Sequence, residues 1–568
     1  MALLGAAFQI GRSALAAYQS AIALAGQNIA NLGNANYTRQ TGRLSTLEGG
    51  PTLGGVSAGG GVLLSGVERH VDEAVESRLR MALGSRAAAE SSYKTLGEIE
   101  ALYNELSEHD LSTQLTQFFN TFGELENDPQ QMTTRQLVLA NADAVARTLR
   151  RQRGALLQQA ADLNHAVEQT TEHANTIAGE IASLNELVVV QQARGSGFSS
   201  ALRDRRDGLL RELAELMDIQ VREQSNGSIN VYVGSEPLVE FGRSRGLRVE
   251  TELEDGLERA AVRFADNNGT VVIRDGRLAA QLAARDEHLS GQVDQLDQLA
   301  RALVYEVNRV QSTGRGLVGY TTITSAYAAG DVNAALDSSP ADLEFPVRNG
   351  SFVVHVRNRE TGQTITRLIE VDLDGLATDT TLSSLAQDLS NVPGLSASVT
   401  ADGRLQLDAA DGSEMWFTED TSGVLAALGV GGLFQGSDAG TIGLQAAVRA
   451  DPRLIAASLS GGLGDGSNAG RLALLGDAVS DLLGQQTIAE FQAGMVSQVA
   501  TRTAAARMTQ EAADAVYSSL LAQRESVSGV SLDEEAINLT KFERAFQGAT
   551  RYLSVLDNLS SEVLALVR

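Results

Sequence analysis

The chain of 568 residues contains no cysteine. Disulfide bonds, thiolate metal ligands and cysteine nucleophiles are therefore excluded. A chain without thiols can also cross an oxidising space without forming cross-links. Lysine is nearly as rare, since it occurs only at Lys94 and Lys541, and neither follows a glycine-rich loop. A phosphate-binding loop that depends on such a lysine is excluded as well.

Positive charge is scarce relative to negative charge. The chain has 45 lysine and arginine residues against 71 aspartate and glutamate residues, which gives a net charge of −26. An acidic surface is repelled by the phosphates of nucleic acid and by anionic membrane surfaces. We therefore expect no nucleic-acid partner.

The N-terminus lacks the features of a targeting segment. No charged residue precedes Arg12, and no small-residue cleavage motif follows a basic start, so a secretory signal peptide is not expected. Residues 13–38 carry no charge, but glutamine and asparagine interrupt the apolar run, so we expect no membrane insertion. Export would need a route without a cleaved signal peptide.

Each end of the chain carries an apolar stripe at helical spacing, with steps of three and four residues. The C-terminal stripe begins at Ser531-Leu-Asp-Glu534, which is typical of a capping box. Packing on a core would explain one such stripe, whereas two matching stripes favour pairing of the two ends. The predicted self-association seam, called the terminal seam below, consists of Leu4, Phe8, Leu15, Tyr18, Ile22, Ile29, Leu32, Leu532, Leu539, Phe542, Phe546, Leu553, Leu556 and Val563.

The predicted fold is mainly α with an α+β insert. Residues 1–33 and 530–568 are expected to pair as a terminal coiled-coil domain. Residues 34–313 and 437–529 are expected to form a long helical rod domain. Within it, alternating residues around Asn226-Gly227 predict a β-hairpin element, at about residues 219–275, with a two-residue turn.

The predicted insert comprises residues 314–436, where strand-like segments surround one helix near residues 382–389. Two further helical segments are expected in the rod. One begins at Asp128-Pro129 and runs to Gln192, because proline suits the first helical position. The other covers about residues 441–524, with a glycine-rich interruption.

No pattern in the sequence strongly predicts a catalytic, cofactor or metal site. The stretch from Gly464 to Ala469 has the spacing of a dinucleotide loop but lacks a preceding strand. Asp372-Leu-Asp374-Gly375 is similar to a calcium loop but lacks the twelve-residue ligand spacing. The six histidines are scattered without metal-ligand spacing. We therefore predict no catalytic residue, no cofactor and no metal site, and no enzymatic activity.

The stretch GQNIANLGNANYTRQ, residues 26–40, ends the first predicted helix, because asparagine and glycine compete with helical backbone. It resembles the signature of the bacterial flagellar rod and hook axial proteins. Its YTRQ ending, together with SGVLAALGVGGLFQG at residues 422–436 and the last forty residues, resembles the hook-associated proteins of the hook–filament junction. The signature positions are Asn28, Asn31, Asn34, Tyr37, Thr38 and Arg39.

One position departs from the family pattern, because Asn36 stands where the family has glycine before Tyr-Thr-Arg. Asparagine is the residue that best replaces glycine at positive φ, so we expect the turn to be kept.

The resemblance implies a structural component that self-assembles into a ring or tube joining hook and filament. It implies four partners: other copies of the chain, the flagellar hook protein, the second hook–filament junction protein and a flagellar export chaperone. It also implies type III export and an extracellular position in the flagellum. Two alternatives stay open, namely another axial protein of the hook or distal rod, and an adhesive or glycan-binding protein acting through the central insert.

Overall fold

The computed structural model describes residues 2–47, 52–53, 56–57, 59–103, 110–193, 199–254, 257–376 and 378–566. The chain divides into two compact units. The first comprises residues 1–94, 163–284 and 505–568, and the second comprises residues 95–162 and 285–504. Three long helices continue from one unit into the other: α2 (Glu73–Tyr103), α4 (Met132–Ala193) and α12 (Ile488–Ser528).

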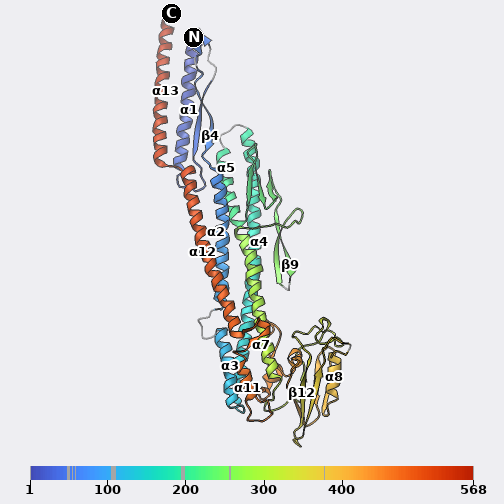
Figure 1. Cartoon of the computed structure of the whole chain (residues 1–568). Helices are drawn as coiled ribbons and strands as arrows, with labels where there is room; N and C mark the ends of the chain where they lie inside the picture. Colours follow the sequence, from blue (N-terminus) through green and yellow to red (C-terminus); the bar gives the residue numbers. More distant parts are fainter. Residues whose placement is uncertain are drawn as a thin grey trace. The chain divides into compact units, whose positions relative to one another are not determined.

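In the first unit, α1 (Ala2–Ala30) and α13 (Leu532–Leu566) lie side by side and run in opposite directions (Figure 1). They approach closely at Gly11, where a Cβ atom would lie 2.5 Å from Cδ2 of Leu553. A hairpin of β1 (Gln40–Thr46) and β4 (Val62–Arg69) packs along α1. The two chain ends are therefore held together as one packed layer.

The rest of the first unit is a small β structure packed on helices. The strands β5 (Gln220–Glu223), β6 (Ile229–Val233), β7 (Glu236–Glu240) and β8 (Arg243–Ser244) form one antiparallel sheet in sequence order. The strands β9 (Leu247–Glu254) and β10 (Leu257–Phe264) form a separate hairpin, and α5 (Ser199–Leu216) and α6 (Gly276–Ala283) complete the helices. The shared core is apolar and draws on α4, α5 and the strands, for example at Ile181, Leu213, Val231 and Phe264.

The β-hairpin predicted around Asn226-Gly227 is present, but its turn is longer than predicted. The amide of Gln224 donates to the carbonyl of Ser228 at 2.8 Å, so three residues form the loop. Gly227 takes a positive φ of 80°, which is typical of a three-residue hairpin.

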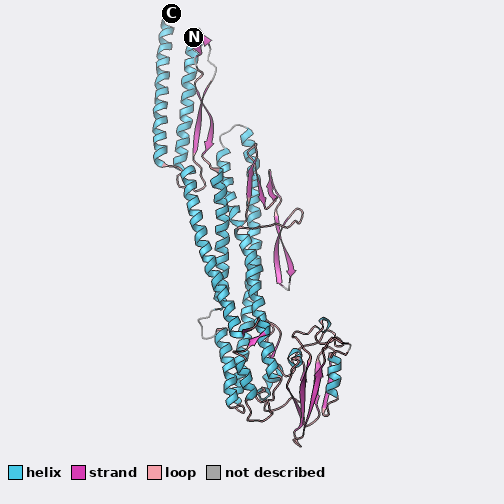
Figure 2. Ribbon diagram, viewed as in Figure 1, coloured by secondary structure: helices cyan, strands magenta, loops and turns pink. Residues whose placement is uncertain are grey.

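The second unit combines a helical part with small antiparallel sheets, of which two are three-stranded (Figure 2). The helices α3 (Leu111–Asn127), α7 (Ser290–Gln311) and α11 (Ser467–Leu474) pack together, and Phe118, Phe122 and Phe434 lie fully buried. One sheet has the order β13-β12-β16, from β13 (Thr364–Val371), β12 (Gly350–Asn358) and β16 (Ser413–Thr418). The other has the order β11-β15-β14, from β11 (Thr322–Thr324), β15 (Leu405–Ala409) and β14 (Leu395–Val399).

The helix predicted near residues 382–389 is present as α8 (Leu382–Ser390), with Thr381 and Ser384 forming a capping box. The remaining elements are short. They are β2 (Thr52–Leu53), β3 (Val56–Ser57), η1 (Ala284–Leu289), η2 (Ser339–Ala341), α9 (Val424–Leu428), β17 (Phe434–Gln435), β18 (Gly443–Leu444), α10 (Ala446–Ala450), η3 (Pro452–Leu454), β19 (Val479–Ser480), η4 (Asp481–Leu483) and β20 (Gln486–Thr487).

Two helix predictions are wrong in extent. The helix expected at Pro129 begins at Met132, because the guanidinium of Arg135 binds the carbonyl of Pro129 at 2.6 and 3.0 Å and stabilises a turn there. The helical run expected over residues 441–524 contains only short helices before α12 starts at Ile488. Positive-φ residues such as Gly461 and Gly484 interrupt it.

The mainly α fold is confirmed by the dominance of long helices. Among the helices of the described residues, none is both long and apolar enough to cross a membrane.

Candidate functional site

The terminal seam lies on α1, α13 and the turns that flank them. Leu556 is buried, and the seam residues Leu32, Leu532 and Val563 are exposed. Leu32 lies beyond the end of α1, and Leu532 is the first residue of α13, so both are at the edge of the pair. The other seam residues are half-buried, namely Leu4, Phe8, Leu15, Tyr18, Ile22, Ile29, Leu539, Phe542, Phe546 and Leu553.

A second apolar stripe lies on α13. Tyr552, Val555, Leu559 and Val563 are spaced by three, four and four residues, so they share one face of the helix. Each is exposed, with exposed fractions between 39% for Val563 and 56% for Val555. We call these four residues the outer stripe. Sequence reasoning placed Val563 in the terminal seam, and only the structure shows that this face is left uncovered by the described residues of the chain.

Asn28 is the centre of the signature. Its side chain is buried in the last turns of α1 and makes four hydrogen bonds, which is the full capacity of an amide. Its Nδ2 donates to the carbonyl of Gln40 at 2.8 Å and to Oε2 of Glu535 at 3.1 Å. Its Oδ1 accepts from the hydroxyl of Tyr37 at 2.7 Å and from the amide of Gln40 at 3.2 Å. One side chain thus joins α1, the signature loop, β1 and α13.

Arg39 makes the second link between the loop and α13. Its Nε donates to Oε1 of Glu535 at 2.9 Å, and its Nη1 lies 2.7 Å from Oε2 of Glu534. Its backbone amide donates to the carbonyl of Ser528, near the end of α12, at 2.9 Å. The Glu535 side chain is only 3% exposed, so its charge depends on these partners. We call Asn28, Tyr37, Arg39 and Glu535 the polar hub.

The predicted capping box at the start of α13 is formed in part. The amide of Glu534 donates to Oγ of Ser531 at 3.4 Å. The carboxylate of Glu534 is instead paired with Arg39. The tertiary partner has replaced the local one, because an arginine offers a charge-assisted bond.

The other signature asparagines shape the turn itself. Nδ2 of Asn31 donates to the carbonyl of Gln27 at 2.9 Å, and Oδ1 of Asn34 accepts from the amide of Asn36 at 3.0 Å. The expected turn is kept, since the amide of Tyr37 donates to the carbonyl of Asn34 at 3.0 Å, but Asn36 does not take a positive φ. Its side chain has another role, because its Oδ1 accepts from Nη2 of Arg211 at 2.9 Å.

Buried ion pairs support the loop, and sequence reasoning missed them. Arg524 donates to Oε1 of Glu76 at 2.9 Å and to the carbonyl of Ala35 at 2.8 Å, and both charged side chains are less than a tenth exposed. Their separation of 448 residues explains why no local pattern shows the pair.

A second buried charge cluster, centred on Arg69, contacts Thr38, which is itself buried. Arg69 lies 2.8 Å from Asp204, also pairs with Asp207, and donates to Oγ1 of Thr38 at 3.4 Å. Burial alone would lower the pKa of Arg69, but Asp207 and Asp204 raise it above its ordinary value. Burial raises the pKa of Asp204, and Arg69 opposes that rise.

The electrostatic environment of the polar hub keeps the phenol of Tyr37 neutral. Burial, together with the negative charges of Asp204 and Glu535, raises the pKa of Tyr37 to about 12. Beside the hub an open cleft of about 520 Å³ is lined by the signature loop and by residues of the α12–α13 connection. These groups orient two helices and a loop, and their arrangement is that of a structural joint.

In the second unit, three carboxylates are close enough to share a cation. Oxygens of Asp372, Asp374 and Asp379 lie within 4.8 Å of one another, and Asp374 is exposed. Two of these oxygens already accept backbone amides, from Gly375 and Leu376. Exposed acidic turns of this kind are common without a metal, so the cluster does not by itself make a metal site.

Comparisons with known proteins agree with the sequence resemblance. Residues 96–323 match the family model described as the helical domain of the flagellar hook-associated protein FlgK. The chain is 27% identical over 552 residues to Flagellar hook-associated protein 1 of Escherichia coli strain K12, covering 94% of each chain. It is 23% identical to the protein of that name from Bacillus subtilis strain 168, covering 98% of this chain and 97% of the relative.

The fold also has a solved counterpart. The structure of the flagellar hook junction protein FlgK from Burkholderia pseudomallei aligns with a TM-score of 0.50 at 15% sequence identity. The alignment covers 80% of this chain and 100% of the other.

Proposed function

We propose that this chain is a member of the flagellar hook-associated protein family and a structural component of the bacterial flagellum that joins the hook to the filament. The proposal extends to this chain the role named in its relatives, Flagellar hook-associated protein 1, which it matches over nearly its whole length. It assembles with copies of itself into a ring or tube at the junction.

The observation that carries self-assembly is the outer stripe on α13. Fully burying an apolar side chain of this size contributes about 1.5 to 3 kcal/mol. The four stripe residues are roughly half exposed, so covering them contributes on the order of 3 to 6 kcal/mol for each subunit contact. A neighbouring subunit that supplies this cover would make the helix pair more stable in the assembly than in the monomer.

We also propose that α1 and α13 act as a paired coiled-coil domain comprising residues 1–33 and 530–568. The polar hub supports this reading, because Asn28 and Arg39 hold the base of α13 against the end of α1. The helical rod of residues 34–313 and 437–529 and the α+β insert of residues 314–436 remain the proposed further domains.

The proposed partners are the flagellar hook protein, the second hook–filament junction protein and an export chaperone that holds the C-terminal helix before assembly. The chain would leave the cell through the flagellar type III apparatus without a cleaved signal peptide and would remain extracellular. It would have no enzymatic activity and need no cofactor.

Electron microscopy of a strain lacking the chain tests the function. Hooks without filaments are expected, and the wild-type chain should restore the filaments. Missing hooks would instead favour the hook or distal-rod alternative, and normal filaments would refute the proposal.

Variants of α13 test whether the outer stripe is a contact surface between subunits. Leu559→Asp places a charge on the outer stripe and should not restore filaments, because burying an unpaired carboxylate is unfavourable. Asn558→Asp, at the adjacent exposed position, is the matched control and should restore them. Equal filament growth with both variants would show that the outer stripe is not a contact surface.

A further inference from the structure

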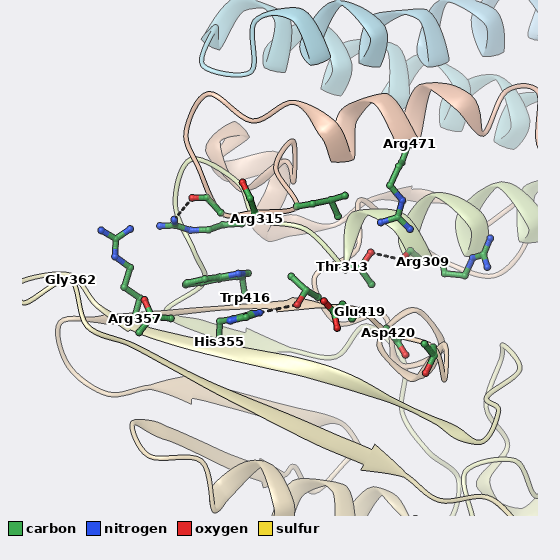
Figure 3. A pocket seen from close by; sticks show the side chains of 16 residues that line it. Arg309, Thr313, Arg315, His355, Arg357, Gly362, Trp416, Glu419, Asp420 and Arg471 are labelled. Carbon is green, nitrogen blue, oxygen red and sulfur yellow. Dashed lines mark hydrogen bonds between the residues drawn. The ribbon is translucent and has the colours of Figure 1, made fainter.

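The second unit contains a cleft of about 960 Å³ that is unusually basic for so acidic a chain. Figure 3 shows its lining, in which Arg309 comes from α7, Arg357 from β12 and Arg471 from α11. Arg315, which follows α7, forms part of the same wall. We call this pocket the arginine cleft.

Positive charge in the arginine cleft is incompletely balanced. Arg309 pairs with Glu306 at 2.9 Å. Within the described part of the chain, neither Arg357 nor Arg471 has a carboxylate within ion-pair distance. Burial and the positive charge of Arg309 lower the pKa of Arg471. An added carboxylate between these arginines would relieve their repulsion.

Arg315 adds an unused donor. Its side chain is only 6% exposed and binds Glu414 and the carbonyl of Gly461. Its Nε has no hydrogen-bond partner among the described residues, although it is buried. A buried donor without a partner is costly.

Two acidic residues, Asp420 and Glu419, also line the cleft. The carboxylate of Asp420 accepts from the amides of Gly423 and Leu425 and therefore holds its own loop. Glu419 is exposed and takes a φ of 58°, a left-handed conformation that is unusual for glutamate. The lining therefore holds four arginines and two carboxylates, and two of the arginines, Arg309 and Arg315, pair with Glu306 and Glu414 outside it.

The aromatic side chain of the cleft is covered on both faces. Trp416 stacks on His355 with ring centroids 4.9 Å apart, and the guanidinium of Arg315 lies 4.6 Å from the Trp416 ring. Figure 3 shows these two neighbours on opposite sides of the indole. A sugar that stacks on tryptophan needs an open ring face, so the cleft favours carboxylates over saccharides.

A complementary surface is present in the same unit. The acidic turn, defined by Asp372, Asp374, Leu376 and Asp379, brings three carboxylates within 4.8 Å of one another. Its Leu376 is 67% exposed. The turn offers clustered negative charge with an apolar tip, and the cleft offers clustered guanidinium groups beside half-buried Leu459.

We infer that the arginine cleft of one subunit binds the acidic turn of a neighbouring copy of this chain. The inference rests on the self-assembly proposed above. Because cleft and turn are different surfaces, the contact is head-to-tail, and head-to-tail contacts close into rings or continue as helical filaments. Its strength should fall as salt rises, since the pairing is electrostatic.

Cysteine cross-linking tests the contact in the assembled flagellum. The natural chain has no cysteine, so introduced pairs give no background. Thr364→Cys in the cleft combined with Leu376→Cys in the turn should form intermolecular disulfides in motile cells. Val479→Cys, at another exposed site of the same unit, combined with Leu376→Cys is the control. Filaments without cross-linking above this control would overturn the inference while leaving the proposed function intact.

A binding assay tests the charge pairing without assembly. The probe is a peptide with the sequence VDLDGLATDT, residues 371–380, added to the full-length chain. Trp416 is the only tryptophan and lines the cleft, so its fluorescence reports binding. Saturable binding is expected, and Arg471→Glu and Arg471→Gln should each weaken it at least about tenfold.

Two controls make that assay decisive. Arg43→Glu changes an exposed arginine of the other unit and should leave peptide binding unchanged. A peptide with its three aspartates replaced by asparagine should not bind. Equal binding by that peptide, or equal weakening by Arg43→Glu and Arg471→Glu, would refute recognition by the arginine cleft.

Discussion

Replacing Arg39 with alanine removes both of the ion pairs that the signature loop makes with α13. Glu535 would keep one hydrogen bond, from Nδ2 of Asn28, but would lose the 2.9 Å bond to a positive charge. Its side chain is only 3% exposed, so the carboxylate starts from a buried position. The perturbation therefore leaves a buried charge with incomplete compensation.

The expected loss of stability follows from how deeply the Arg39–Glu535 ion pair is buried. Breaking a fully buried ion pair by removing one partner costs about 3 to 5 kcal/mol. The Arg39 side chain is 19% exposed and Glu535 is 3% exposed, so solvent screens the pair slightly. We expect a loss of about 2 to 4 kcal/mol in the stability of the α1–α13 pair.

Hydrogen exchange of the amides in the first turns of α13 measures this loss locally. A change of about 2 to 4 kcal/mol corresponds to an acceleration of roughly 30- to 700-fold, at a factor of ten for each 1.4 kcal/mol. The matched control is Arg43→Ala, because Arg43 pairs with Glu68 on the surface, where the two side chains are 71% and 61% exposed. A surface pair contributes at most about 1 kcal/mol, so little acceleration is expected.

A double variant tests whether the unpaired charge of Glu535 causes the faster exchange. In the Arg39→Ala background, Glu535→Gln removes the stranded charge and should recover part of the lost protection. If Arg39→Ala and Arg43→Ala accelerate exchange equally, or if Glu535→Gln makes the loss larger, the hub is not held by this charge pair.

Three further predictions concern the same unit. Phe542→Asp should abolish incorporation into flagella, because it buries a charge in the terminal seam. Thr540→Asp, at a nearby exposed position, should leave incorporation intact. Filament growth in a complemented strain measures both effects. Gly11→Val should destabilise the helix pair by about 1 to 3 kcal/mol, because its Cβ would lie 2.5 Å from Cδ2 of Leu553, and exchange of the α1 amides would report it. The pKa of Tyr37 is raised to about 12 in the fold, above an unfolded value of about 10. The neutral phenol of Tyr37 therefore contributes its full stabilisation of the fold below about pH 10, and this contribution is lost as pH rises through 12. Unfolding measured across that range should be less pH-dependent in Tyr37→Phe, and an unchanged dependence would show that another group titrates.

Local patterns in the sequence were sufficient for several elements. Ser531 correctly marked the start of α13, because a hydroxyl that accepts a backbone amide is a local feature of helix beginnings. The strand-like segments predicted within residues 314–436 are present, for example as β12 and β16, because β-branched and aromatic residues favour strands. The asparagines after α1 correctly marked its end.

Other predictions failed where a distant residue decided the outcome. The start of α4 moved to Met132 because Arg135 holds the carbonyl of Pro129 and also binds the carbonyl of Ile455, 320 residues away. The helical run expected beyond residue 441 is broken into short segments, and buried Asn468, at the start of α11, binds the carbonyls of Val310 and Ala456. The contacts of Arg135 with Ile455 and of Asn468 with Val310 join residues that are too far apart for a local window to contain.

The sequence by itself determined that both chain ends are amphipathic helices, that a turn follows the first, and that the chain resembles flagellar axial proteins. Helix periodicity and capping depend on residues three or four positions apart, so they are readable along the chain. Only the tertiary structure decided that Asn28 and Arg39 meet Glu535, and that Val563 lies on an exposed stripe of α13. Those outcomes depend on which helix faces touch, and in an antiparallel pair the facing residues lie about 500 positions apart in the sequence.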